Sequence, residues 1–337
     1  MQDFVADLGL AVLFLTAGFA MDPAALRGRP LRNALKGWAM TVAISLAAAI
    51  WLMSHGLASG WLLTGLAMTT TAIGALLPAL RDAGLLAPPY GPMVLAAGAL
   101  GEAGPVAVLT LLLARGRAPE QAVIMLAFAA VPVRAVMLAA RASTGPFARI
   151  IERTMETSGQ FPMRLAICLL ILFVVLSEQL GIDLILGAFT AGTVVRSGLP
   201  ASRHDAMSAR LDGIGSAFLI PIFFVISGSR LVTALFFNAT ALRMMVLYAL
   251  LMLIARGVPA LVLYRADLSS RQRVMLALHC GTQLSLVVAI TGIAVHRGLM
   301  PRNQGADLVG GGILTMMLFP ALARRVLHGR GAADSPG

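Results

Sequence analysis

The stretch WLLTGLAMTTTAIGALLPAL occupies residues 61–80, and VMLALHCGTQLSLVVAITGIAV occupies residues 274–295. Both are apolar and long enough to cross a bilayer, for which a helix needs about 20 residues. Each carries a polar interruption at mid-span, formed by Thr69, Thr70 and Thr71 in the first and by Gly281, Thr282 and Gln283 in the second. Non-helical backbone is tolerated inside a membrane only where protein or water satisfies its polar groups. The two stretches therefore predict a pair of broken transmembrane helices inside a bundle.

The composition places the whole chain in a membrane. Of the 337 residues, 58% are hydrophobic and only 12% are charged, and the mean hydropathy is +0.87. A soluble domain carries about 25% charged residues, so this sequence has too little polar surface to cover a water-soluble globule. These values exclude a soluble enzyme, a disordered chain and a disulfide-stapled domain. They predict an all-α polytopic membrane protein in contact with the lipid bilayer.

Eleven apolar runs predict about 11 transmembrane helices. The runs cover residues 4–21, 34–54, 60–80, 91–114, 119–140, 163–179, 182–198, 215–229, 240–264, 273–295 and 305–323. Loops on one side of the bundle carry about three basic residues for each one on the other side. Because basic loops stay inside the cell, we expect the N-terminus outside and the C-terminus in the cytoplasm. This asymmetry accounts for most of the net charge of +11, so nucleic acid is not a predicted partner.

The two interrupted runs hold mirrored places in the chain. Each is the middle member of a group of three runs, and the two groups have opposite orientations in the predicted topology. Transporters built from inverted repeats place their binding site where such broken helices meet. The alternative is that the threonines only bond to carbonyls of the preceding helical turn.

A carboxylate lies in the middle of the fourth run, PMVLAAGALGEAGPVAVLTLLLA (92–114). Glu102 at that depth costs on the order of 3 kcal/mol to insert, and such residues usually mark ion or proton pathways. Glu102 is therefore the candidate group for binding either a proton or a cation. The alternative is a protonated glutamate that only forms a hydrogen bond with a neighbour.

A second charge, Arg256, lies in the ninth run, on the cytoplasmic side of its centre. Arg256 either faces the Glu102 helix as a permanent positive charge or extends toward the membrane surface. His279, just before the second interruption, is either a proton relay or a hydrogen-bonded core residue. The sequence contains no metal-ligand cluster, nucleophile triad or phosphate-binding loop, so it predicts neither an enzyme nor a cofactor.

Six stretches make the chain similar to the monovalent cation:proton antiporters of the sodium/hydrogen exchanger superfamily, on the potassium-efflux side of it. They are LGLAVLFLTAGFAMD, MTTTAIGALLPALRDAGLL, LGEAGPVAVL, GIDLILGAFTAGTVVRSG, LDGIGSAFLIPIFFVISGSRL and GTQLSLVVAITGIA. They occur in the family's order and cover almost the whole chain.

The resemblance implies an inverted-repeat antiporter fold with two crossing broken helices, which works as an elevator-like homodimer in the plasma membrane. The core bundle would comprise about residues 34–114 and 240–323, the dimer or scaffold helices about 4–21 and 163–229, a linker helix 119–140, and a short cytoplasmic tail 324–337. Glu102 would couple protons to Na⁺ or K⁺ by holding either one transiently, with Arg256 as its charge partner. The two interruptions would line the ion site.

Three features depart from the family pattern. Gly101 and Glu102 stand where the family usually has a polar residue followed by aspartate, so a single carboxylate implies one charge exchanged per cation. The family's first one or two transmembrane helices are expected to be missing before residue 1. No nucleotide-binding regulatory domain is expected after the last run.

Two other functions stay open on the sequence alone. The same scaffold could carry an organic anion held by half-helix ends and Arg256. It could also be a degenerate membrane protein that transports nothing and acts as an interaction partner.

Overall fold

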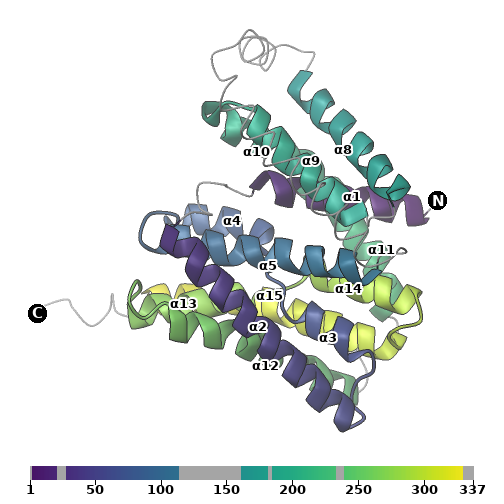
Figure 1. Ribbon diagram of the computed structural model, residues 1–337, viewed down its shortest axis with the longest axis vertical. Helices are drawn as coiled ribbons and strands as arrows, with labels where there is room; N and C mark the ends of the chain where they lie inside the picture. The colour runs from purple at the N-terminus through teal and green to yellow at the C-terminus, as the bar shows by residue number, and fades with distance from the viewer. Residues whose placement is uncertain (1, 21–27, 114–160, 181–183, 233–238, 329–337) are drawn as a thin grey trace, which may run out of the picture. The chain divides into compact units, whose positions relative to one another are not determined.

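The computed structural model describes residues 2–20, 28–113, 161–180, 184–232 and 239–328, and every regular element in this part of the chain is a helix (Figure 1). Seven helical segments there are long and apolar enough to cross a membrane, and shorter apolar helices accompany them. Each predicted run coincides with a helix or a pair of helices, except the run 119–140, which lies outside the described residues. The prediction of an all-α polytopic membrane protein is confirmed.

The chain divides into two compact units that alternate along the sequence. Unit 1 comprises Met1–Met21 and Val106–Ile226, and unit 2 comprises Asp22–Pro105 and Ser227–Gly337. The boundary between Pro105 and Val106 falls within helix α5 (Tyr90–Leu113). Each unit thus combines segments that are far apart in the sequence.

Unit 1 is built around helices α1 (Gln2–Ala20) and α9 (Leu184–Gly198), which pack along one another. Two glycines allow their backbones to touch. A Cβ atom at Gly18 would collide with the Phe189 carbonyl, and one at Gly192 would collide with the Leu15 carbonyl. The other elements of this part of the chain are α8 (Phe161–Gln179), η1 (Ala201–Arg203), α10 (His204–Ile214), the π-helical turn η2 (Gly215–Leu219) and the start of α11 (Ile220–Val232).

Unit 2 contains two groups of helices with the same order of elements. The first group is α2 (Gly28–Ser54), α3 (Trp61–Ala67), α4 (Ile73–Asp82) and the first part of α5. The second is α12 (Ala239–Leu263), α13 (Ser270–Gly281), α14 (Ser285–His296) and α15 (Arg302–His328). In each group a long helix precedes a broken pair, and another long helix follows it.

The two broken pairs cross in unit 2. Helix α3 packs against α14, and helix α4 packs against α13. Each half of one broken helix therefore meets a half of the other, and the two gaps lie between them. The mirrored interruptions predicted that the two broken helices meet, and the family resemblance implied that they cross; the structure shows both.

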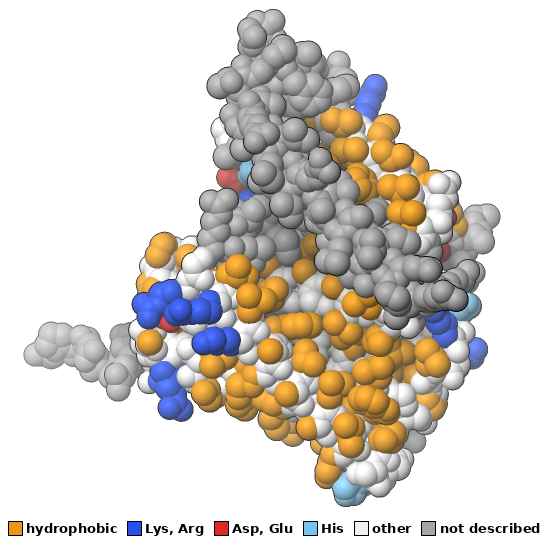
Figure 2. All heavy atoms as spheres, viewed as in Figure 1, with side chains coloured by type: hydrophobic (Ala, Val, Ile, Leu, Met, Phe, Trp, Pro, Cys, Tyr) orange, Lys and Arg blue, Asp and Glu red, His pale blue; other side chains and the backbone are white. Residues whose placement is uncertain are grey.

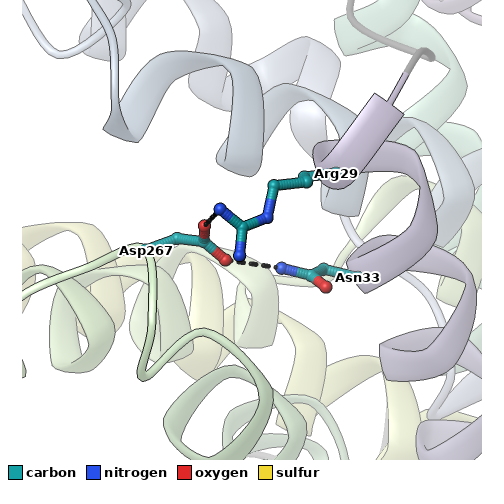
Figure 3. A network of polar contacts seen from close by, with 3 residues as sticks. All are labelled: Arg29, Asn33 and Asp267. Atoms are coloured by element: carbon teal, nitrogen blue, oxygen red, sulfur yellow. Dashed lines mark hydrogen bonds and ion pairs between the residues drawn. The ribbon is translucent and has the colours of Figure 1, made fainter.

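Helix ends extend past the apolar runs that predicted them. Helix α2 begins at Gly28 rather than at residue 34, and α15 continues to His328 rather than stopping at residue 323. At the start of α2, Arg29 forms an ion pair with Asp267 (Nη1 to Oδ1, 3.6 Å), and Asn33 donates to the same carboxylate (2.9 Å; Figure 3). Hydropathy detects only the apolar part of a helix, so the polar turns at these helix ends were missed.

The surface of unit 2 is suited to a bilayer. It exposes many large apolar side chains, among them Trp51, Leu250, Ile254, Met317 and Leu318. Hydrophobic side chains cover most of its visible face, while Lys and Arg gather at the edge where α2 begins (Figure 2). Apolar flanks with charged rims are the arrangement that lipid requires.

Candidate functional site

The helix breaks lie where the sequence predicted them. Helix α3 ends at Ala67 and α4 begins at Ile73, so Thr69, Thr70 and Thr71 occupy the first gap. Helix α13 ends at Gly281 and α14 begins at Ser285, so Thr282 and Gln283 occupy the second, with Gly281 as the last helical residue before it. All six residues are buried in unit 2.

Backbone groups freed by one break are satisfied by the other. The Ala72 N–H donates to the Thr282 carbonyl (2.9 Å), and the Thr71 hydroxyl donates to the Cys280 carbonyl (2.8 Å). The Thr71 N–H donates to the Gly101 carbonyl on α5 (3.0 Å). Because buried backbone groups need partners, each gap depends on the other gap and on α5 for its stability.

Gln283 joins the two gaps through its side chain. Its Nε2 donates to the Met68 carbonyl (3.1 Å), and its Oε1 lies 3.1 Å from the Thr70 hydroxyl. Thr69 differs, because its hydroxyl bonds to the Leu66 carbonyl three residues earlier (2.7 Å). Local bonding, the alternative interpretation of the threonines, thus describes Thr69 fully and Thr70 in part, because the Thr70 hydroxyl also lies 3.0 Å from the Ala67 carbonyl. The Thr71 hydroxyl bonds only to the other broken helix.

Thr315 on α15 forms hydrogen bonds with the backbone of the second gap. Its hydroxyl accepts from the Gln283 N–H (3.0 Å) and lies 2.9 Å from the Gln283 carbonyl, to which it can donate. Sequence reasoning missed this residue. Its only signal was a threonine among apolar residues in the middle of the last run, and threonines that bond only within their own helix occur in the same setting.

Glu102 lies on α5 beside the start of α4. Its side chain is 6% exposed, and its Oε1 accepts from the Gly74 N–H at 3.2 Å. Gly74 is in the first turn of α4, directly after the first gap, where free N–H groups and the helix dipole favour a negative charge. The break therefore supplies a stabilising environment for the carboxylate inside the bundle.

Arg256 is buried, at 4% exposure, rather than extended toward the surface. Its Nη2 donates to the Ala97 carbonyl on α5 (2.9 Å), and its Nε donates to the Cys280 carbonyl near the end of α13 (3.4 Å). No ion pair joins it to Glu102, although both residues are among those described. The structure brings the guanidinium to α5 and the second break, but not into contact with the carboxylate.

Gly101 makes room for this arrangement. A Cβ atom at residue 101 would lie 2.6 Å from Arg256 Nη2 and 2.6 Å from Thr71 Oγ1. The departure from the family pattern at this position thus has a physical counterpart. The space that a polar neighbour of the carboxylate would need is filled by the guanidinium and a threonine hydroxyl.

His279 forms a hydrogen bond between its Nδ1 and the Tyr90 hydroxyl (2.7 Å) and is buried in unit 2. This geometry agrees with the interpretation of His279 as a hydrogen-bonded core residue. Among the described residues, no group of three or more His, Cys, Asp or Glu side chains is arranged around a common point that could hold a metal ion.

Taken together, the site is a buried carboxylate next to two unwound segments rich in hydroxyl, amide and carbonyl oxygens. Unwound carbonyls and half-helix ends are the groups that coordinate small cations in transporters with broken helices. A carboxylate in the same place can hold a proton instead. The arrangement suits binding and exchange of small ions.

The sequence profile of the family described as "Sodium/hydrogen exchanger, transmembrane" matches residues 2–326. The chain belongs to the sodium/hydrogen exchanger family. The match covers nearly all of the chain, including both helix breaks and Glu102. The resemblance inferred from the six stretches is confirmed, as is the expectation of a multi-pass membrane protein.

Two relatives carry names that describe antiporters. "Putative Na(+)/H(+) antiporter YjbQ" of Bacillus subtilis is 25% identical over 289 residues, which cover 82% of this chain and 46% of that protein. "Probable Na(+)/H(+) antiporter 3" of Methanocaldococcus jannaschii is 33% identical over 87 residues, which cover 25% of this chain and 22% of that protein. The chain thus spans less than half the length of either relative, and both are named as transporters rather than enzymes.

Proposed function

We propose that this chain exchanges protons for a monovalent cation, Na⁺ or K⁺, across the plasma membrane, with Glu102 as the coupling group. The observation that carries the proposal is the buried carboxylate of Glu102 at the start of α4, beside two crossing helix breaks. A carboxylate in this environment can be neutralised by a proton or by a cation, but not fully by both at once. Competition between the two ions would couple their movements.

The oxygen atoms around the two gaps would complete the cation site. Thr70, Thr71 and Gln283 place hydroxyl and amide oxygens in buried positions, and the backbone there is not committed to helical bonding. Such neutral ligands can replace the hydration shell of a small cation. With one carboxylate, one proton would leave for each cation that binds, so the exchange would be electrically neutral.

Arg256 would stabilise the site without direct contact with the carboxylate. It holds the Cys280 carbonyl and the Ala97 carbonyl, and so fixes α13 and α5 at the level of the breaks. Its permanent charge would also offset the charge of Glu102 when no ion is bound. These two roles require a buried cation with several donors, which arginine provides.

Movement of the site would follow alternating access. We propose that a core formed by about residues 34–114 and 240–323 carries the ion, and that helices in 4–21 and 163–229 form the scaffold of a homodimer. The compact unit 2 contains both helix breaks together with Glu102 and Arg256, which supports the assignment of these parts to one moving body. The N-terminus would lie outside and the C-terminus in the cytoplasm.

Proteoliposomes containing a pH-sensitive dye test the proposal directly. We expect Na⁺ or K⁺ to produce a pH change in vesicles with the wild-type protein and no change with Glu102→Gln. The matched control is Glu178→Gln, which makes the same chemical change at an exposed position on α8 and should leave the response intact. A full response from folded Glu102→Gln would reject Glu102 as the coupling group.

The same assay addresses the other functions. A wild-type protein that is folded but responds to none of Na⁺, K⁺ and Li⁺ would reject cation exchange. Uptake of an organic anion that depends on Arg256 would then favour the anion transporter. If no such uptake occurs, the non-transporting membrane protein is favoured.

A further inference from the structure

A second group of buried polar side chains lies in unit 2, away from the helix breaks. It comprises Asp307 and Gln304 on α15, Tyr248 on α12, and Ser59 and Thr64 at the start of α3; we call it the Asp307 cluster. Asp307 is 9% exposed, and Tyr248 is 0% exposed. Asp307 precedes Gly311 by four residues, so it lies on the face of α15 that packs against Tyr248 on α12.

Two atoms of the cluster lack partners. Asp307 Oδ1 and the Tyr248 hydroxyl are both buried, and neither has a hydrogen-bond partner among the described residues. Buried polar atoms are almost always hydrogen-bonded, because leaving one unpaired in an apolar interior is unfavourable. A buried carboxylate oxygen and a buried hydroxyl that lack partners, on two helices that pack together, indicate a position for a bound species.

The other polar groups of the cluster are hydrogen-bonded to one another. Gln304 accepts from the Ser59 N–H (2.8 Å) and donates to the Ser59 carbonyl (3.0 Å) and to the Thr64 hydroxyl (2.8 Å). These bonds fix the amide and join α15 to α3. Helices α12 and α15 also approach closely, because a Cβ atom at Gly311 would lie 2.8 Å from the Tyr248 Cβ. These contacts fix the Gln304 amide and the close approach of α12 and α15 on which Tyr248 and Asp307 lie.

The Asp307 cluster is distinct from the site at Glu102. Tyr248 precedes Arg256 by eight residues on α12, a separation of about 12 Å along the helix. Asp307 precedes Gly312 by five residues on α15, about 8 Å, and it is at Gly312 that α15 contacts the Gln283 carbonyl. The cluster lies toward the end of unit 2 where α3 and α15 begin.

We propose that the Asp307 cluster is a second cation site, which holds a monovalent cation between the Asp307 carboxylate and the Tyr248 oxygen. One carboxylate with neutral oxygen ligands matches a single positive charge. No basic side chain forms an ion pair with Asp307 among the described residues, so the carboxylate is available to a cation. In the proposed orientation this site would lie between the outer surface and the helix breaks, where it would concentrate cations on that side.

Thermal unfolding of the purified protein in detergent measures binding without transport. A ligand that binds only the folded state raises the unfolding midpoint as its concentration rises. The test compares the unfolding midpoint in NaCl, KCl and LiCl with that in choline chloride at equal ionic strength. In Glu102→Gln, which removes the first carboxylate, we expect at least one of the three cations to raise the midpoint by about 2 °C or more over choline.

The response should disappear when Asp307→Asn is added to Glu102→Gln, and it should persist when the exposed Asp82→Asn is added instead. Tyr248→Phe removes only the hydroxyl, so it replaces the Asp307 variant if that variant does not fold. It should raise the cation concentration needed for the same increase in unfolding midpoint at least threefold. An unchanged response in either folded variant would overturn the proposal. So would a Glu102→Gln protein that responds to pH but to none of the three cations.

The two sites can fail separately. If Glu102 does not bind the cation, Glu102→Gln keeps the whole wild-type response, and Asp307→Asn alone abolishes it. If the Asp307 cluster is not a site, Asp307→Asn alone keeps the whole response and Glu102→Gln alone abolishes it.

Discussion

At the scale of single residues, the small size of Gly101 determines which side chains fit next to Glu102. Gly101 leaves room for the Arg256 guanidinium and the Thr71 hydroxyl, and the guanidinium uses that room to reach Ala97 on α5. The carboxylate itself accepts from the Gly74 N–H of α4, while the guanidinium and the threonine hydroxyl bond to backbone carbonyls beside it. The identity of residue 101 matters through volume as well as through charge.

We expect Gly101→Ala to destabilise the protein by about 1–3 kcal/mol, because the added methyl group would displace Arg256 or Thr71. The control is Gly292→Ala on α14, where a Cβ atom would meet nothing within 4 Å. Thermal unfolding in detergent measures both. Equal stability of the two variants would show that the space next to residue 101 is not limiting.

Arg256→Lys separates the charge of this residue from its hydrogen bonds. Lysine keeps the positive charge, but a single ammonium group cannot reproduce the planar guanidinium that reaches both Ala97 and Cys280. We expect a loss of about 1–3 kcal/mol in stability from the unsatisfied carbonyls. Wild-type stability and wild-type cation-driven pH change in this variant would mean that charge alone is required.

Sequence reasoning identified the charged residues of the site but not their partners. Glu102 and Arg256 could be found because an ionisable residue in an apolar run is unusual. The carbonyls of Ala97 and Cys280 could not, because every residue has a carbonyl and only the fold decides which ones are free. Asp307 could have been found by the same rule as Glu102, since it lies in the last apolar run.

At the scale of elements, the broken helices are stable only as a crossed pair. The first gap takes its partners from the second gap and from α5, and the second is held by Thr315 on α15. The sequence predicted both gaps because polar triplets interrupted long apolar runs. It did not predict the bonds between them, which depend on the register of two helices more than 200 residues apart.

Thr315→Val tests how far α15 holds the second gap. The substitution removes the hydroxyl that serves the Gln283 N–H, so we expect a loss of about 1–3 kcal/mol in stability and a weaker apparent affinity for the cation. Thr291→Val is the matched control, because the Thr291 hydroxyl bonds only to carbonyls within its own helix α14. Thermal unfolding and the cation dependence of the pH change in proteoliposomes compare them. Similar effects of both substitutions would contradict a special role for Thr315.

At the scale of the whole molecule, composition and hydropathy were sufficient for the fold class. A chain with this little charge must place helices in lipid, and the described helices follow the apolar runs closely. The division into two units was not visible in hydropathy, because lipid-facing and core helices are equally apolar. It follows instead from packing, as when α1 and α9, far apart in sequence, pack with their backbones in contact.

The proposed orientation predicts which loops a membrane-impermeant reagent can reach from outside the cell. In the orientation proposed from the basic residues, the loop after α4 would lie in the cytoplasm and the loop after α2 outside. His55 and Asp82 are exposed in these two places, so each can carry a single cysteine in a Cys168→Ser, Cys280→Ala background. In intact cells, a membrane-impermeant maleimide should label His55→Cys and should label Asp82→Cys only after permeabilisation. The reverse pattern would invert the topology, place the Asp307 cluster on the cytoplasmic side of the helix breaks, and leave the geometry of the Glu102 site unchanged.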